Sequence, residues 1–149
     1  ATGKAMFSVF KGVHENVVVE GEDVMRLVTL RSHDQYNTTI YAMDDRYRGV
    51  FGRRDVLFMN EQDMAAQGLE HGDRVDIHTA LPGSALTLRD ITVVAYGIAP
   101  GTVGAYYPEA NVLVPLNYLD EESGTPSYKS VPVRLTLRSK EIRPMAGAR

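Results

Sequence analysis

Short apolar runs, separated by turn residues, recur along most of the chain. Some are continuous and rich in β-branched side chains, which is typical of buried strands, and others alternate apolar with polar residues as half-buried strands do. The pattern predicts strands at residues 25–30, 56–59, 74–79, 85–96, 103–107 and 131–137. The turn formers Pro82 and Gly83 lie between two of these runs and predict a hairpin there.

One segment, from Asn60 to Gly68, has the pattern of a helix. Asn60 is a good N-cap that can accept a hydrogen bond from the amide of Asp63, acidic residues occupy the first turn, and Gly68 stands where a helix often ends in a left-handed residue. Residues 44–49 begin acidic, continue basic and end in Gly49. That order leaves open either one helical turn or a turn closed by glycine.

The order of these elements predicts the fold class. Many short strands, one clear helix and no regular alternation of strand with helix favour a closed, mainly β barrel over a doubly wound sheet. At 149 residues the chain is expected to form a single domain over 1–149. We expect residues 1–22 to be an arm, residues 140–149 to be a loose tail, and the chain to be a fragment of a larger one.

Composition and charge exclude several classes of function. A net charge of -3 and a pI near 5.8 argue against binding to nucleic acid or to an acidic membrane. The chain has no cysteine, and its four histidines lack short ligand spacings, so we expect no disulfide, cysteine nucleophile or metal site. No run approaches the roughly 18 apolar residues of a membrane span, and no signal peptide opens the chain, so a cytoplasmic location is expected.

The polar segment 31–41, which follows the first predicted strand, is the leading candidate for a binding site. It combines basic, acidic, amide, hydroxyl, imidazole and phenol groups. Loops on a rigid scaffold often carry binding groups, which favours a functional role. The residues alone leave open a solvated turn whose side chains only satisfy local backbone groups.

Several segments, taken in order, resemble the C-terminal domain of molybdopterin dinucleotide oxidoreductases. The stretch from Asn60 to Val75 is similar to the helix-to-strand passage of that domain, and residues 3–7 to its entry. The three cofactor loops of the family resemble residues 30–39, residues 101–103 with 107–111, and residues 124–129. The Ser-His-Asp-Gln-Tyr-Asn form of residues 32–37 is most similar to the formate-dehydrogenase-like subfamily.

This resemblance implies a double-psi β-barrel with a few short helices. It further implies a parent oxidoreductase in which molybdenum is held by bis(molybdopterin guanine dinucleotide), with this domain closing over the cofactor and not catalytic by itself. The partners would be upstream domains of the same polypeptide. Because the chain has no cysteine, the metal's ligand and any iron-sulfur cluster would also lie upstream.

The cofactor presents an anionic pyrophosphate and flat rings with fixed donors and acceptors, and these call for different side chains. Cations and hydroxyls suit the pyrophosphate: Arg31, Ser32, Thr38 and Thr39. Groups that can pair with two ring atoms suit the ring edges: His33, Asp34, Gln35 and Asn111. Tyr107 and Tyr128 could cover a ring face or donate a hydroxyl, and Lys129 completes the cofactor-binding set.

Each of these residues has a plainer interpretation. Arg31 could form a surface ion pair with Asp34, and His33 could be an ordinary surface histidine. Asn111 could shape a turn, and Lys129 could be a solvated residue at the start of a strand.

Two broader alternatives also stand. A non-catalytic double-psi barrel could serve as an adaptor or substrate-recognition module. The Gly83-Ser84 bond could undergo self-cleavage, as in a small decarboxylase with the same barrel, although a Pro-Gly turn gives this glycine an ordinary reason to be present. His71 and His78 are assigned to a turn and to a strand surface.

Overall fold

The computed structural model describes residues 3–7 and 21–140. The expected arm and tail therefore lie mostly outside the described residues. The strands are β1 (Met25–Leu30), β2 (Val56–Met59), β3 (Arg74–Thr79), β4 (Thr87–Ala95), β5 (Thr102–Tyr106) and β6 (Val131–Ser139). An α-helix, α1 (Glu61–Ala66), follows β2, and a 3-10 helix, η2 (Glu109–Leu113), follows β5.

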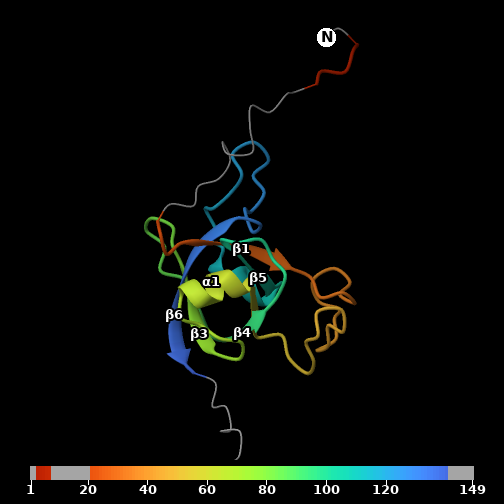
Figure 1. The fold of residues 1–149 in the computed structure, drawn as a ribbon. Helices are drawn as coiled ribbons and strands as arrows, with labels where there is room; N and C mark the ends of the chain where they lie inside the picture. The colour runs from red at the N-terminus through yellow and green to blue at the C-terminus, as the bar shows by residue number, and fades with distance from the viewer. Residues whose placement is uncertain (1–2, 8–20, 141–149) are drawn as a thin grey trace, which may run out of the picture.

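Within the described residues, six strands close into a barrel in the order β1-β5-β2-β4-β3-β6 (Figure 1). The pairs β1–β5 and β2–β4 are parallel, and the other neighbours are antiparallel. The mainly β barrel predicted from the sequence is therefore confirmed, and its two parallel pairs agree with the double-psi topology. No helix in this part of the chain is long and apolar enough to cross a membrane.

The helix forms where it was predicted, with one correction at its start. Asn60 accepts a hydrogen bond from the amide of Gln62, at 2.8 Å, and not from that of Asp63. An N-cap side chain can reach either amide, so the pattern alone did not decide between them. Gly68 has the expected left-handed conformation, with φ of 64°. Residues 44–49 form the glycine-closed turn and not a helical turn.

Residues 31–53, which we call the lobe, leave the barrel after β1 and return just before β2 (Figure 1). The strand β2 is buried on both of its faces because the lobe covers the outer one. Leu57 and Met59 belong to the core inside the barrel. Val56 and Phe58 belong to a second apolar cluster, which also contains Val50 and Tyr106. The lobe is thus packed onto the barrel wall through this cluster.

Candidate functional site

Most of the three segments that resemble cofactor loops meet at one end of the barrel. The first segment (30–39) leaves β1, the 107–111 part of the second follows β5, and the third (124–129) precedes β6. The 101–103 part of the second segment is not brought to this end, because it lies at the start of β5, beside the start of β1. Because β1 is parallel to β5 and antiparallel to β6, the three segments begin or end beside one another. Backbone hydrogen bonds join them: the amide of Tyr107 donates to the carbonyl of Leu30 at 2.7 Å, and that of Thr29 donates to the carbonyl of Tyr128 at 3.2 Å.

Ser32 and Gln35 lie at the inner side of the first segment, only 3% and 9% exposed. The Ser32 amide donates to Gln35 Oε1 at 3.1 Å. The Gln35 side-chain amide donates in turn to the carbonyl of Tyr107 at 2.8 Å. The polar atoms of these two predicted residues are therefore engaged by protein groups that connect the first and second segments, while their contact with a cofactor stays a prediction.

Arg54 is at the centre of this arrangement, although the sequence did not single it out. Its guanidinium is 4% exposed and donates to Ser32 Oγ, to Gln35 Oε1 and to the carbonyl of Tyr107, at 2.8, 3.1 and 2.9 Å. An ion pair with Glu109, at 2.6 Å, completes its surroundings. In the sequence Arg53-Arg54-Asp55 nothing distinguishes this buried arginine from its half-buried neighbours, so no local signal would have found it.

Two cations, Arg31 and Lys129, lie where the first and third segments meet. Lys129 Nζ donates to the carbonyl of Thr29, and burial together with the charge of Arg31 lowers the pKa of this lysine. Arg31 is exposed, and among the described residues it has no carboxylate partner; Asp34 pairs with Arg46 instead, at 3.6 Å. The proposed surface pair between Arg31 and Asp34 is thus absent, and in the described part of the chain neither cation forms an ion pair.

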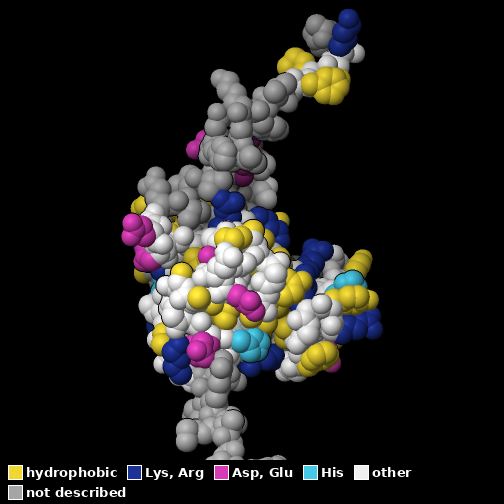
Figure 2. All heavy atoms as spheres, in the orientation of Figure 1, with side chains coloured by type: hydrophobic (Ala, Val, Ile, Leu, Met, Phe, Trp, Pro, Cys, Tyr) yellow, Lys and Arg dark blue, Asp and Glu magenta, His cyan; other side chains and the backbone are white. Residues whose placement is uncertain are grey.

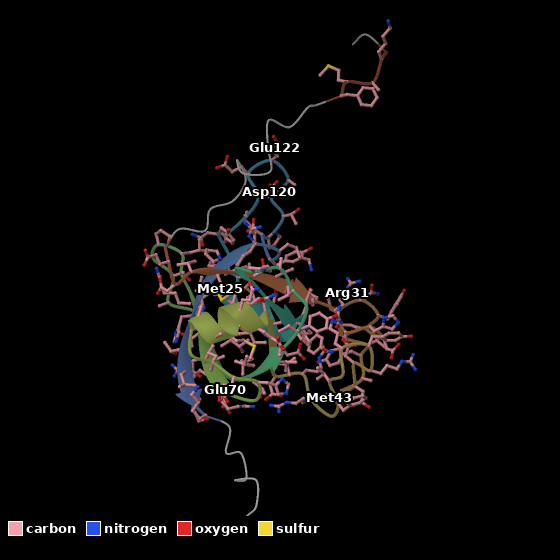
Figure 3. The ribbon with its side chains drawn as sticks, viewed as in Figure 1. Met25, Arg31, Met43, Glu70, Asp120 and Glu122 are labelled. Atoms are coloured by element: carbon pink, nitrogen blue, oxygen red, sulfur yellow. The ribbon has the colours of Figure 1, made fainter. Side chains whose placement is uncertain are left out.

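Figure 3 shows Arg31 at the junction of β1 and the lobe, whereas Asp120 and Glu122 lie on a separate projecting loop. The nearest acidic group on the second segment, Glu109, is committed to Arg54. Among the described residues, none of these three acids therefore forms an ion pair with Arg31 or Lys129. An anion bound here would relieve the repulsion between Arg31 and Lys129.

The second and third segments enclose a small hollow of about 180 Å³. The rings of Tyr107 and Tyr128 lie 6.3 Å apart, centroid to centroid, at 31°. Both line the hollow, and so does the exposed residue Asn111. Three predicted site residues from two segments are thus brought together around one opening that combines aromatic walls with an amide.

The remaining predicted residues lie on the outside of the lobe. The ring of His33 stacks on Tyr47, with centroids 3.6 Å apart. Asp34 forms its ion pair within the lobe, and Thr38 and Thr39 are partly and fully exposed. The structure does not bring these four side chains together with the second or third segment, so their contact with a cofactor stays a prediction.

The lobe is fastened to the barrel by a buried carboxylate. Asp45, 1% exposed, accepts hydrogen bonds from Tyr106 Oη at 2.9 Å and from the guanidinium of Arg48 at 2.5 Å. Arg48 also donates to the carbonyl of Arg31, at 3.1 Å. Burial opposes ionisation of Asp45, but the two donors outweigh it and lower its pKa, while burial and this carboxylate raise the pKa of Tyr106. Because Asp45 holds Arg48 in place, the hydrogen bond from Arg48 also fixes the backbone carbonyl of Arg31 relative to the barrel.

The chemistry of this end of the barrel fits a molybdopterin dinucleotide. The two cations suit an anionic pyrophosphate, and the hollow between Tyr107 and Tyr128, with its amide, suits a flat ring with polar edges. The described residues contain no group of His, Asp or Glu side chains that could hold a metal ion.

Comparisons with known proteins agree with this geometry. The family described as the molydopterin dinucleotide binding domain matches residues 25–132, which include all three segments. An uncharacterized oxidoreductase of Mycobacterium tuberculosis is 47% identical over 91% of this chain, and protein YdeP of Escherichia coli is 42% identical over 90%. In each case the match covers 18% of the relative, so the chain spans less than a fifth of their length. The chain belongs to the family of molybdopterin dinucleotide-binding domains.

Proposed function

We propose that this chain is the C-terminal domain of a molybdenum oxidoreductase that resembles formate dehydrogenase, where it binds bis(molybdopterin guanine dinucleotide). The bound cofactor would supply two-electron redox chemistry at its metal. The chain's own residues bind and orient the cofactor and carry out no reaction by themselves. Turnover of formate by this chain alone would contradict that division of labour.

The observation that carries the proposal is the meeting of the three segments at one end of the barrel. Arg31 and Lys129 come from different segments and form a cationic site, and neither is in an ion pair with another residue that the structure describes. Tyr107, Tyr128 and Asn111 form a ring-sized hollow beside the third segment. A barrel that served only as an adaptor would have no need to gather these groups, so the convergence favours a cofactor site over the adaptor.

The parent protein and its other domains belong to the proposal as well. Support comes from the relatives, which are more than five times as long as the matched stretch and include one named an oxidoreductase. The form of residues 32–37 is the support for a formate-dehydrogenase-like type. We place the metal's ligand and any iron-sulfur cluster in upstream domains of the same polypeptide.

The surface of the lobe supports contact with such domains. Figure 2 shows hydrophobic, basic and histidine side chains gathered there. Large apolar side chains exposed on the lobe are Tyr36, Ile40, Tyr41, Met43, Tyr47 and Phe51. Several such side chains on one short segment are typical of a surface that another protein element covers.

The test is the variant Arg31→Ala in the full-length protein. Loss of one charge-assisted contact to a phosphate weakens cofactor binding about tenfold or more. We expect less pterin and less metal per protein molecule after purification, with the melting temperature of the cofactor-free protein almost unchanged. Arg89→Ala is the matched control, because Arg89 is also exposed but lies on β4.

Two outcomes would count against the proposal. Full retention of the cofactor by the Arg31→Ala protein would show that the cationic site does not bind it. A large fall in the melting temperature of the cofactor-free protein would assign Arg31 a structural role instead.

A further inference from the structure

Arg54 is a fully buried cation whose polar atoms are all directed at the two segments that flank it. A buried charge is costly unless it is paired and hydrogen-bonded, so a residue of this kind indicates a specific requirement. Nε donates to Glu109 at 2.6 Å, and the two terminal nitrogens donate to Ser32, Gln35, Tyr107 and Glu109. Each of the three nitrogens thus donates to at least one of these two segments.

Two aromatic rings contact the guanidinium. Its carbon lies 3.9 Å from the ring centroid of Tyr41 and 4.6 Å from that of Tyr106. Tyr41 belongs to the lobe, and Tyr106 is the last residue of β5. The planar, fork-shaped guanidinium matches this stack and its ring of acceptors, whereas a lysine ammonium has neither the plane nor the reach.

The acceptors belong to two segments that carry different parts of the proposed site. Ser32 is the chain neighbour of Arg31, the proposed anion contact. Glu109 begins η2 and lies two residues before Asn111, which lines the hollow. The position of one guanidinium therefore fixes how far the anion contact lies from the ring hollow.

We propose that Arg54 is a positioning residue, which joins the first and second segments so that both hold one cofactor molecule together. This inference rests on the proposed function. It adds a residue that acts through the protein, since Arg54 is buried and its hydrogen bonds join the two segments to each other.

The experiment combines Arg54→Lys with Arg31→Ala in the full-length protein and measures the rate of cofactor release well below the melting temperature. Arg54→Lys alone should speed release about tenfold. Arg31→Ala should also speed release, but by a factor at least about fivefold smaller in the Arg54→Lys protein than in the wild type. The two substitutions are then not additive, which is the sign of coupled residues. Arg53→Lys is the matched control: its partners Asp55 and Thr92 lie on the barrel wall, so release should change less than about twofold.

The outcomes separate the possible failures. If Arg54→Lys lowers the melting temperature of the cofactor-free protein but the two effects on release are additive, Arg54 is structural only and the inference is wrong. If Arg31→Ala has no effect on release in the wild type, the proposed site itself fails and the inference fails with it. Should Arg54→Lys not fold, Glu109→Gln, which keeps the shape but removes the charge that pairs with Arg54, takes its place in the same cycle with the same criteria.

Discussion

At the scale of single residues, Asp45 shows how the lobe depends on one ionised group. Its Oδ2 atom accepts from both Arg48 and Tyr106, whereas its Oδ1 atom is buried without a hydrogen-bond partner. A buried carboxylate with an unused oxygen is stable only while the charge is matched by its donors. The ionised form of Asp45 is therefore part of what holds the lobe on the barrel.

This arrangement predicts a pH-dependent effect of Asp45→Asn. The folded state lowers the pKa of Asp45, so its ionisation stabilises the fold above the usual value of 3.8, and this stabilisation is lost as the pH falls through the lower, folded pKa. At pH 7 the variant should lower the free energy of unfolding by about 2 kcal/mol, because Arg48 loses its charged partner. Urea unfolding between pH 3 and 7 measures this. A difference from wild type that does not shrink in acid would contradict it.

Residue identities predicted where polar groups occur but not which way they face. Ser32 and Gln35 were assigned to a ligand from their chemistry, and the structure directs both toward Arg54. Arg54 itself has the same sequence surroundings as the half-buried Arg53. Its burial depends on Glu109, which lies 55 residues away along the chain, and a contact of that kind is absent from any local pattern.

At the scale of elements, the boundaries of α1 follow from local chemistry. Asn60 caps the start, and its side-chain amide also donates to the carbonyl of Ile98, at 3.0 Å. Gly68 follows the end with a positive φ, and a Cβ atom built on it would meet nothing within 4 Å. The requirement for glycine at this position is thus one of backbone conformation and not of space.

Replacement of Gly68 tests that distinction. Gly68→Ala should lower the free energy of unfolding by about 1 kcal/mol, and Gly68→Asn by less, because asparagine tolerates the left-handed conformation. Gly97→Ala is the control, since that glycine also has open space but no positive φ, and it should be neutral or slightly stabilising. Denaturant unfolding distinguishes these values. Equal effects at the two glycines would show that backbone conformation is not the cause.

Strands were predicted well where apolar residues follow a regular period. The limits of β1, β2 and β3 agree with the predicted ranges. In β4 the apolar positions skip from Leu88 to Ile91, and there the structure has a register shift against β3 and a positive φ of 61° at Asp90. The interruption was visible in the sequence, but a bulge is defined by the partner strand, which the sequence does not identify.

At the scale of the whole molecule, the lobe and the barrel share one folded unit. Val50 reaches from the lobe into the cluster with Phe58 and Tyr106, where the two rings meet edge to face at 5.4 Å. The sequence predicted the closed barrel because its strands have local patterns. It did not predict this second core, because Val50, Phe58 and Tyr106 come from separate parts of the chain and only the fold brings them together.

The shared core predicts that the lobe contributes to global stability. Val50→Ala removes two methyl groups from a site that is 4% exposed and should lower the free energy of unfolding by about 2 kcal/mol. Ile40→Ala, in the same lobe but 63% exposed, should change it by less than about 0.5 kcal/mol. Thermal or urea unfolding measures both. If Val50→Ala is as neutral as Ile40→Ala, the lobe is only attached to the barrel and does not stabilise it.

The parallel pairing of β1 with β5 has a consequence for how such a domain can diversify. Register places Leu30 beside Tyr106, so the first and second segments start as neighbours whatever their own length or composition. Insertions within either segment leave both starting points fixed. The length and sequence of one segment can thus diverge among related proteins while the other segment stays the same. Arg54 limits that freedom: a change at Ser32 or Gln35 in one segment would need a compensating change near Glu109 in the other. Paired substitutions at these positions, and not independent ones, are the evolutionary trace that this architecture would leave.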